Sequence, residues 1–307
     1  MKLTKLIAPL VIVLLMAACK TSDKLALQLN YQKGKKYYYT TVTNQKMNQE
    51  IMGKVVDIDN TTTIGYIYEV KDINKEGNYM VTITYDKYDV ENRGTTDTLS
   101  GKMDKGEIMK GFTYDMVVTP KGKVLEVHGM EKLMDKAFDK AIPDSMKDSE
   151  SAKFMDPMMD KLKSEFSDKK MGDMMEQMTN YFPDDAVEVG DSWERVVNNS
   201  TIMPMKITTK YKVTDVKDNI VTLDVKATFE PGDGAGMMGA MGMKMNFEGD
   251  QKGTMQIDTK TGLLVKSMQD MDMKTTITVM GMTTPGMKIK QQISMEAKEM
   301  QEYLLLA

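Results

Sequence analysis

A strict alternation of apolar and polar residues over long stretches is the feature that most constrains the fold. From Met287 to Ala297 every second residue is Met, Ile, Gln or Ala, and the residues between them are polar or charged. The same period of two runs through 79–85 and 207–213, where Tyr, Val, Ile and Thr predominate. Successive side chains of a strand point to opposite faces of a sheet. The pattern therefore predicts long antiparallel strands with one buried face and one face in water.

A different period marks the chain over 129–183. Apolar residues recur there at helical spacing in three stretches, 133–141, 158–166 and 171–182. Ser167-Asp168 is typical of a helix N-cap placed just before the last of them. We expect helices in this segment, inserted between two regions that are rich in strands.

The two strand-rich regions resemble each other. The matching blocks are Val70–Ile73 with Val213–Val216, Met80–Ile83 with Ile220–Leu223, and Thr119–Val124 with Thr259–Leu264. The last two pairs share an offset of 140 residues. Each region also opens with a glycine turn into an aromatic strand, at Gly34–Tyr37 and at Gly190–Trp193. We infer a duplicated β unit.

The amino terminus has the plan of an export signal. Lys2 and Lys5 precede an uninterrupted apolar run, Leu6–Met16, that is too short to span a bilayer stably. The next residues, Ala17-Ala18-Cys19, complete a stretch that resembles a bacterial lipobox, in which the cysteine becomes the lipid-modified first residue. Cys19 is the single cysteine of the chain, so no disulfide is expected. We predict lipidation at Cys19 and a membrane partner held through the acylated residue, in the cell envelope and in the outer membrane of a Gram-negative bacterium.

Together these patterns predict a mainly β (α+β) fold. It has two related long-stranded antiparallel sheet units, which can curl into half-barrels, and an α-helical insertion between them. Each unit alone would expose an edge strand, so we expect the two to cooperate in one body. The expected segments are a signal peptide at 1–18, a lipidated tether at 19–24, an N-terminal β unit at 25–128, the helical insertion at 129–183 and a C-terminal β unit at 184–307.

Charge and motif content exclude several classes of function. The chain carries 41 basic and 45 acidic side chains, and loss of the signal removes two of the lysines. Such an acidic balance argues against a nucleic-acid partner, which needs concentrated Lys and Arg. The single histidine, His128, precedes Gly129 at the end of a predicted strand and has no paired nucleophile in the sequence. No phosphate loop or dinucleotide motif occurs, so we expect a noncatalytic protein without a cofactor.

Four short stretches carry a resemblance to a known family. They are the lipobox ending in Cys19, the opening Leu27–Leu29 with Gly34 and Tyr37, the Gly190–Trp193 entry to the second half, and the Ile257–Gly262 hairpin. On these residues the chain resembles the uncharacterised Bacteroidota lipoprotein family numbered 6263 among domains of unknown function. The resemblance covers essentially the whole mature chain. It implies a cell-envelope lipoprotein and brings no catalytic residue with it.

Methionine is the anomaly of the composition, with 34 residues against 7 phenylalanines and one tryptophan. The densest run lies at 236–245, and its thioethers are Met237, Met238, Met241, Met243 and Met245. Thioethers are soft donors that suit Cu(I) or Ag(I). Methionine also replaces Leu and Phe as an adaptable apolar filler. The helical spacing of Met171, Met174, Met175 and Met178 favours the second explanation.

These alternatives lead to two predictions of function. In the first, the methionine face of the helices lies on a concave sheet, and this noncatalytic, lipid-anchored envelope lipoprotein binds a hydrophobic ligand or an envelope partner. Met171, Met174, Met175 and Met178 would then line the site for a lipid or a partner protein. In the alternative, the run at 236–245 makes the chain a soft-metal binding protein.

Overall fold

The computed structural model describes residues 24–51, 54–93, 109–133, 135, 167–199, 205–232, 243–279 and 282–301. Its strands are β1 (Lys36–Ile51), β2 (Lys54–Ile73), β3 (Tyr79–Arg93), β4 (Thr113–Val118), β5 (Val124–His128), β6 (Ser192–Asn199), β7 (Met205–Lys217), β8 (Ile220–Pro231), β9 (Met243–Asp258), β10 (Leu264–Val279) and β11 (Met282–Glu299), with helix α5 (Asp168–Thr179) between β5 and β6. The signal peptide and Cys19 lie outside the described residues. The mainly β fold predicted from the alternation is confirmed.

All eleven strands belong to one antiparallel sheet with the order β5-β4-β3-β2-β1-β11-β10-β9-β8-β7-β6. Two consecutive meanders, β1 to β5 and β6 to β11, join where β1 pairs with β11, from Tyr37 opposite Glu299 to Gln49 opposite Met287. The expected two units are therefore halves of a continuous sheet. The sheet is open, with β5 and β6 at its two edges.

The backbone of the two halves supports the internal repeat. The N–H of Gly34 donates to the carbonyl of Val70, and the N–H of Gly190 donates in the same way to the carbonyl of Val213. A β-bulge follows each of these valines. In both bulges the next aspartate accepts a hydrogen bond from the N–H of its own successor. The two halves therefore share the glycine turn, the β-bulge after the valine and the hydrogen bond to the aspartate that follows it.

The predicted alignment of the repeats is wrong by two residues at one strand. Val81 pairs with Val70, and Leu223 pairs with Val213, so Leu223 rather than Val221 is the equivalent of Val81. Five residues lie between the paired Ile73 and Tyr79, and four lie between the equivalent pair, Val216 and Val221. The alignment at a fixed offset assumed a larger difference in turn length than the structure contains.

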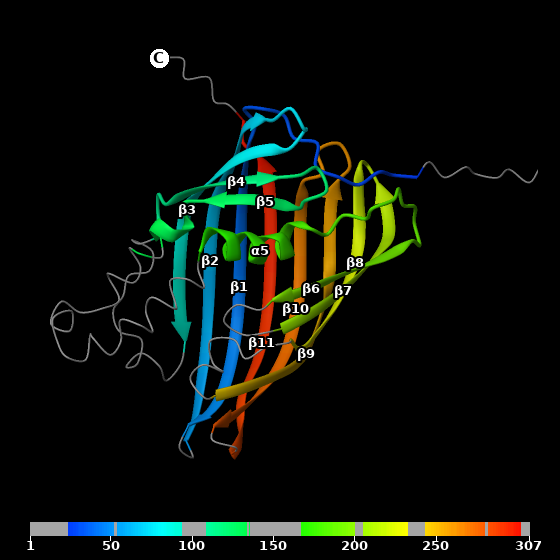
Figure 1. Cartoon of the computed structure of the whole chain (residues 1–307). Helices are drawn as coiled ribbons and strands as arrows, with labels where there is room; N and C mark the ends of the chain where they lie inside the picture. The colour runs from blue at the N-terminus through cyan, green and yellow to red at the C-terminus, as the bar shows by residue number, and fades with distance from the viewer. Residues whose placement is uncertain are drawn as a thin grey trace, which may run out of the picture.

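Figure 1 shows a strongly curled sheet whose two edges, β4–β5 and β6–β7, come forward over the concave face of the long central strands. We call the end where the chain enters, near Leu25, the proximal end. The distal end is where the β1–β2 and β10–β11 hairpins turn, at the bottom of Figure 1. The long central strands extend distally past the level of α5.

The proximal half of the concave face is filled by a tyrosine-rich core. Tyr31, from the segment that precedes β1, lies 4.9–5.6 Å between ring centroids from Tyr37, Tyr68 and Tyr79. All four rings are buried, and the Tyr79 hydroxyl donates to the carbonyl of Leu29 at 3.0 Å. The amino-terminal segment is therefore part of the core and closes it at the proximal end.

Helix α5 covers the same core. The predicted N-cap residue Ser167 precedes it, but the helix ends at Thr179, short of the predicted Phe182. The Asp168 carboxylate accepts hydrogen bonds from the N–H groups of Gly129, Met130 and Glu131, so it holds the turn that follows β5. Within the described ranges no helix has the length and apolar character needed to cross a membrane.

Candidate functional site

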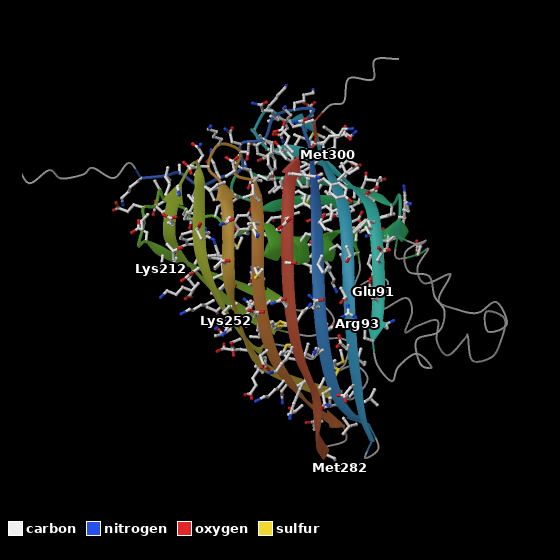
Figure 2. The ribbon with its side chains drawn as sticks, turned by 180° about the vertical axis from the view of Figure 1, so that it is seen from behind. Glu91, Arg93, Lys212, Lys252, Met282 and Met300 are labelled. Atoms are coloured by element: carbon white, nitrogen blue, oxygen red, sulfur yellow. The ribbon has the colours of Figure 1, made fainter. Side chains whose placement is uncertain are left out.

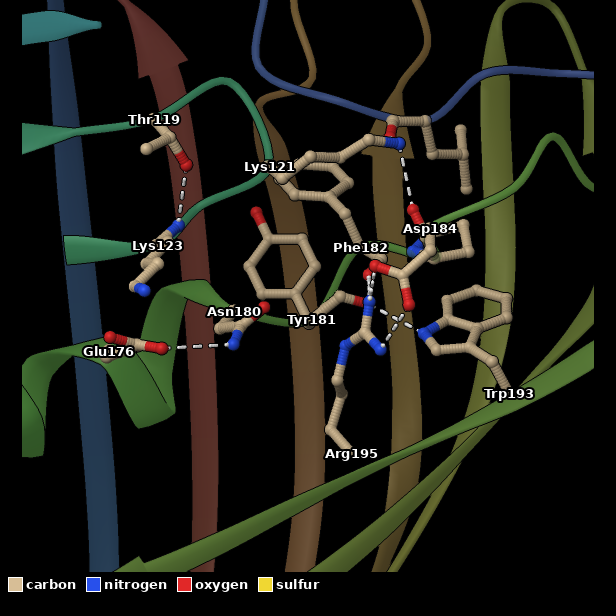
Figure 3. A network of polar contacts seen from close by, with 12 residues as sticks. Thr119, Lys121, Lys123, Glu176, Asn180, Tyr181, Phe182, Asp184, Trp193 and Arg195 are labelled. Atoms are coloured by element: carbon tan, nitrogen blue, oxygen red, sulfur yellow. Dashed lines mark hydrogen bonds and ion pairs between the residues drawn. The ribbon is translucent and has the colours of Figure 1, made fainter.

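A strap formed by residues 181–184 closes the proximal half at the β6 edge (Figure 3). The Trp193 indole donates to the carbonyl of Tyr181 at 2.9 Å and stacks on Tyr211 with ring centroids 5.4 Å apart. Two residues later on β6, the Arg195 guanidinium makes two hydrogen bonds to the Asp184 carboxylate, at 3.0 and 3.1 Å. It also donates to the carbonyl of Phe182. Both aromatic and charged contacts therefore fix the strap to β6.

Lys121 ties the strap to the amino-terminal segment. Its ammonium donates to the carbonyl of Pro183 at 2.8 Å and to the carbonyl of Leu27 at 3.2 Å, which Figure 3 shows at the β4–β5 turn. The Arg195 guanidinium holds the pKa of the Asp184 carboxyl below its usual range. Burial raises the pKa of Tyr211 to about 12. The proximal core is a sealed, packed structure.

Beyond this core the central strands continue for about 20 Å toward the distal end, at about 3.3 Å per residue. Pairing and alternation place one set of their side chains on the concave face, in rows that cross the strands. From β2 through β1, β11 and β10 to β9, the first row is Asn60, Gln45, Gln291, Met271 and Gln251, and the next is Ile58, Met47, Ile289, Met273 and Gly249. We call these two rows and the residues distal to them the distal concave face.

The distal concave face carries its own apolar cluster, separate from the tyrosine-rich core. Phe247, Met273 and Ile289 are buried at its centre. Partly buried methionines from four strands pack against them, namely Met47, Met205, Met271 and Met287. Such thioether side chains are flexible and polarisable, and they adapt to irregular apolar shapes. The arrangement is suited to an apolar ligand.

The convex face of the same strands has the opposite character. Lys46 and Asp59 lie 3.8 Å apart, Lys290 and Asp272 lie 3.5 Å apart, and Lys266 and Glu296 lie 3.6 Å apart, as cross-strand ion pairs. Figure 2 shows charged side chains over this whole face, with Arg93 and Lys252 among those labelled. Exposed pairs of this kind contribute little to stability. The convex face is a solvated surface, and it does not belong to the site.

The structure places the predicted site residues at different depths. Met171 is buried in the tyrosine-rich core, and Met174 and Met175 pack against that core from α5. Met178 lies in the last turn of α5, and its side chain is outside the described residues. Met171, Met174 and Met175 fill space between α5 and the sheet. A ligand at this helix face therefore stays a prediction.

The metal-site and lipidation predictions fall largely outside the described residues. Cys19, Met237, Met238 and Met241 are not described, and Met243 and Met245 are described only as backbone of β9, opposite Val279 and Ile277. In the described ranges no three His, Cys, Asp or Glu side chains are placed together to hold a metal ion. The soft-metal alternative and the lipid anchor stay predictions.

Sequence reasoning missed the residues of the distal concave face. Met47, Ile58 and Phe247 belong to it but stand in none of the methionine runs singled out above. The signal that finds part of the face is the alternation from Met287 to Ala297, whose odd positions all point to the concave side. The pairing of β1 with β11 supplies the rest.

Comparison with known proteins identifies a family and a fold. A model of the family of unknown function DUF6263 matches residues 59–264. No curated protein matches the chain. A solved structure concerned with lipid-protein interactions in lipovitellin is similar with a TM-score of 0.50 at 9% identity, over 91% of this chain and 26% of that chain. The chain thus spans about a quarter of the lipovitellin chain, and the likeness is one of fold.

Two bacterial structures match with lower scores. A DUF1329 family protein from Desulfovibrio piger has a TM-score of 0.22 at 12% identity, over 89% of this chain and 88% of that chain. The outer membrane protein OprG from Pseudomonas aeruginosa has a TM-score of 0.20 at 10% identity, over 89% of this chain and 98% of that chain.

Proposed function

Because the chain belongs to DUF6263, a family of unknown function, we propose a function from the geometry of its sheet. The protein is a noncatalytic, lipid-anchored protein of the cell envelope that binds a hydrophobic ligand on its distal concave face. The ligand class is an acyl-chain lipid, since the cluster around Phe247 and Met273 presents flexible apolar side chains along parallel rows.

The observation that carries this proposal is the contrast between the two faces of the same strands. On β10, Met271 and Met273 point to the concave side, whereas Asp270, Asp272 and Lys274 point to the convex side. A sheet needs one apolar face where it packs on a core, but these residues lie beyond the core that α5 and the strap close. Each buried methylene contributes about 0.8 kcal/mol, so an acyl chain on this face gains affinity with every carbon it covers.

The fold likeness adds support of a general kind. The structure concerned with lipid-protein interactions in lipovitellin is similar in fold to this chain, at a TM-score of 0.50 over 91% of this chain. The common fold supplies a concave apolar surface on which lipid binding can be built. The residues that would bind lipid here are this chain's own.

Membrane attachment is the second part of the proposal. The acylated Cys19 would lie only a few residues before Leu25, which bridges to Val187 at the proximal end. Two or more acyl chains are needed for stable anchoring. We expect the intact mass of protein extracted from membranes to show a chain that begins at an acylated Cys19. A Cys19→Ala variant should lose acyl label and membrane attachment, and label retained on that variant would contradict the assignment.

The ligand site is tested with a matched pair of methionines on β10. Met271 points to the concave face, and Met268 points to the convex face and is 47% exposed. The titration uses the full chain. In a titration with a fluorescent acyl-chain probe, we expect Met271→Lys to weaken binding at least tenfold, because the ammonium would be buried with the chain.

Met268→Lys is the control and should leave probe binding unchanged. Circular dichroism should show that both variants keep the sheet of the parent protein. Equal affinity of both variants, or no binding of any acyl probe to the parent protein, would overturn the proposed site.

A further inference from the structure

Four of the five residues in the first row of the distal concave face have side-chain amides. Gln45 lies directly opposite Asn60 on β2 and opposite Gln291 on β11, and Met271 separates Gln291 from Gln251. We propose that this amide row binds an uncharged, hydrogen-bonding head group of the ligand. The inference rests on the proposed function and names the class of lipid: a neutral amphiphile such as an acylglycerol.

Three of these amides have free hydrogen-bonding capacity. The side chains of Gln45, Asn60 and Gln291 are partly buried, and no hydrogen bond joins any of them to another described residue. Partly buried polar groups without partners cost free energy unless water or a ligand satisfies them. Each amide offers both donors and an acceptor, so the row can bind hydroxyl and ester groups together.

The fourth amide belongs to a chain of polar contacts on the same face. The Gln251 side chain donates to the amide oxygen of Gln269, and the Gln269 amide donates to the Ser267 hydroxyl at 3.1 Å. The oxygen of the Gln251 amide is not used in this chain. These contacts fix the side chains of Gln251 and Gln269, so the acceptor at this end of the row is held in place.

The charge distribution selects a neutral head group. Along the rows that cross from β2 to β9, every paired concave position carries an uncharged side chain between the tyrosine-rich core and Met287. Where the first row continues across β8 and β7 to β6 it reaches Arg195, whose guanidinium is already paired with Asp184. A charged head group would be partly desolvated on this face without a free counter-ion, which is unfavourable.

The position of the row also orients the ligand. On its proximal side lies the sealed tyrosine-rich core, and on its distal side lies the row of Ile58, Met47, Ile289 and Met273. A head group held at the amides therefore directs its acyl chain toward the distal end. The ligand lies along the strands with its polar group nearest the proximal core.

The test compares two ligands with the same acyl chain, a monoacylglycerol and the corresponding fatty acid at pH 8, in competition with the fluorescent probe. The protein is the full chain. We expect the monoacylglycerol to bind at least tenfold more tightly than the fatty-acid anion. Gln291→Leu, which keeps the size of the side chain, should weaken monoacylglycerol binding about fivefold or more, the equivalent of about one hydrogen bond.

Gln292→Leu is the matched control, because Gln292 is the next residue of β11, points to the convex face and donates to Asp270 at 3.0 Å. It should not change monoacylglycerol affinity. Fatty acid that binds as tightly as the monoacylglycerol, or Gln291→Leu with full affinity, would overturn the role of the amide row while leaving lipid binding in place. If neither ligand displaces the probe and the probe itself does not bind, the proposed function fails as well.

Discussion

Raising the pH from 9 to 12 is expected to unfold the protein in one cooperative transition. The cause is the tyrosine-rich core, in which burial raises the pKa of Tyr39, Tyr68 and Tyr181 well above the usual value of 10.0. Burial likewise raises the pKa of Tyr31, and that of Tyr37 to about 12. These phenols stay protonated in the folded protein at a pH where the unfolded chain has lost their protons.

The sign follows from proton linkage. Because the folded-state pKa values are raised, the contribution of each phenol is fully present below pH 10 and is lost as the pH rises through the folded value. Above pH 10 each fully buried tyrosine removes about 1.4 kcal/mol of stability per pH unit. Tyr31, Tyr39, Tyr68 and Tyr181 together remove about 5 kcal/mol per unit, which is comparable with the whole stability of a typical domain.

The measurement is a pH titration followed both by circular dichroism and by tyrosinate absorbance. We expect most of the absorbance to appear in the same transition in which the sheet signal is lost. Tyr31→Phe keeps the ring but removes one buried phenol, so it should shift the midpoint to higher pH. Tyrosines that ionise near pH 10 while the sheet remains intact would contradict the sealed core.

Replacing Gly253 with alanine is expected to cost about 3 kcal/mol of unfolding free energy. Gly253 lies on the concave side of β9, directly opposite Gln269 of β10. A Cβ atom there would stand 2.1 Å from the carbonyl oxygen of Met268 and 2.7 Å from the Cα of Gln269. These are backbone atoms, so β9 and β10 would have to separate or flatten, and the curl of the sheet would be disturbed.

Gly34→Ala is the control, because a Cβ atom at Gly34 meets no atom within 4 Å and only the backbone angle φ of +85° opposes it. That strain costs about 1–2 kcal/mol. Thermal unfolding should therefore show a loss of about 6 °C or more for Gly253→Ala, and a smaller loss for Gly34→Ala. Equal losses would show that the close approach of β10 to Gly253 does not determine the curvature.

Most of the fold follows from the sequence because alternation is strong where a strand faces a packed core. The odd residues from Met287 to Ala297 are on the concave face, as the alternation predicts. The last predicted helix is present, but it is shorter than predicted. Tyr181 and Phe182 leave the helical path because their rings are buried in the core. Helical spacing alone does not separate a residue that ends a helix from one that follows it.

The candidate site follows from the sequence only in part. On β1 the concave positions change from Tyr37 and Tyr39 to Thr41, Thr43 and Gln45, so the apolar alternation fades before the amide row begins. Which face these polar residues occupy is fixed by the register with β2 and β11. The β1–β11 pairing joins opposite ends of the chain, and local patterns do not specify it.

The most direct test of the account is to map where an acyl chain lies. A monoacylglycerol with a photoreactive group near the chain end is cross-linked to the protein, and the labelled residues are identified by peptide mass spectrometry. We predict labels on the distal concave face, at its partly buried members Met47 and Met287, with competition by unlabelled monoacylglycerol. Labels confined to exposed positions such as Met268 and Met282, or labels that excess ligand does not reduce, would contradict it.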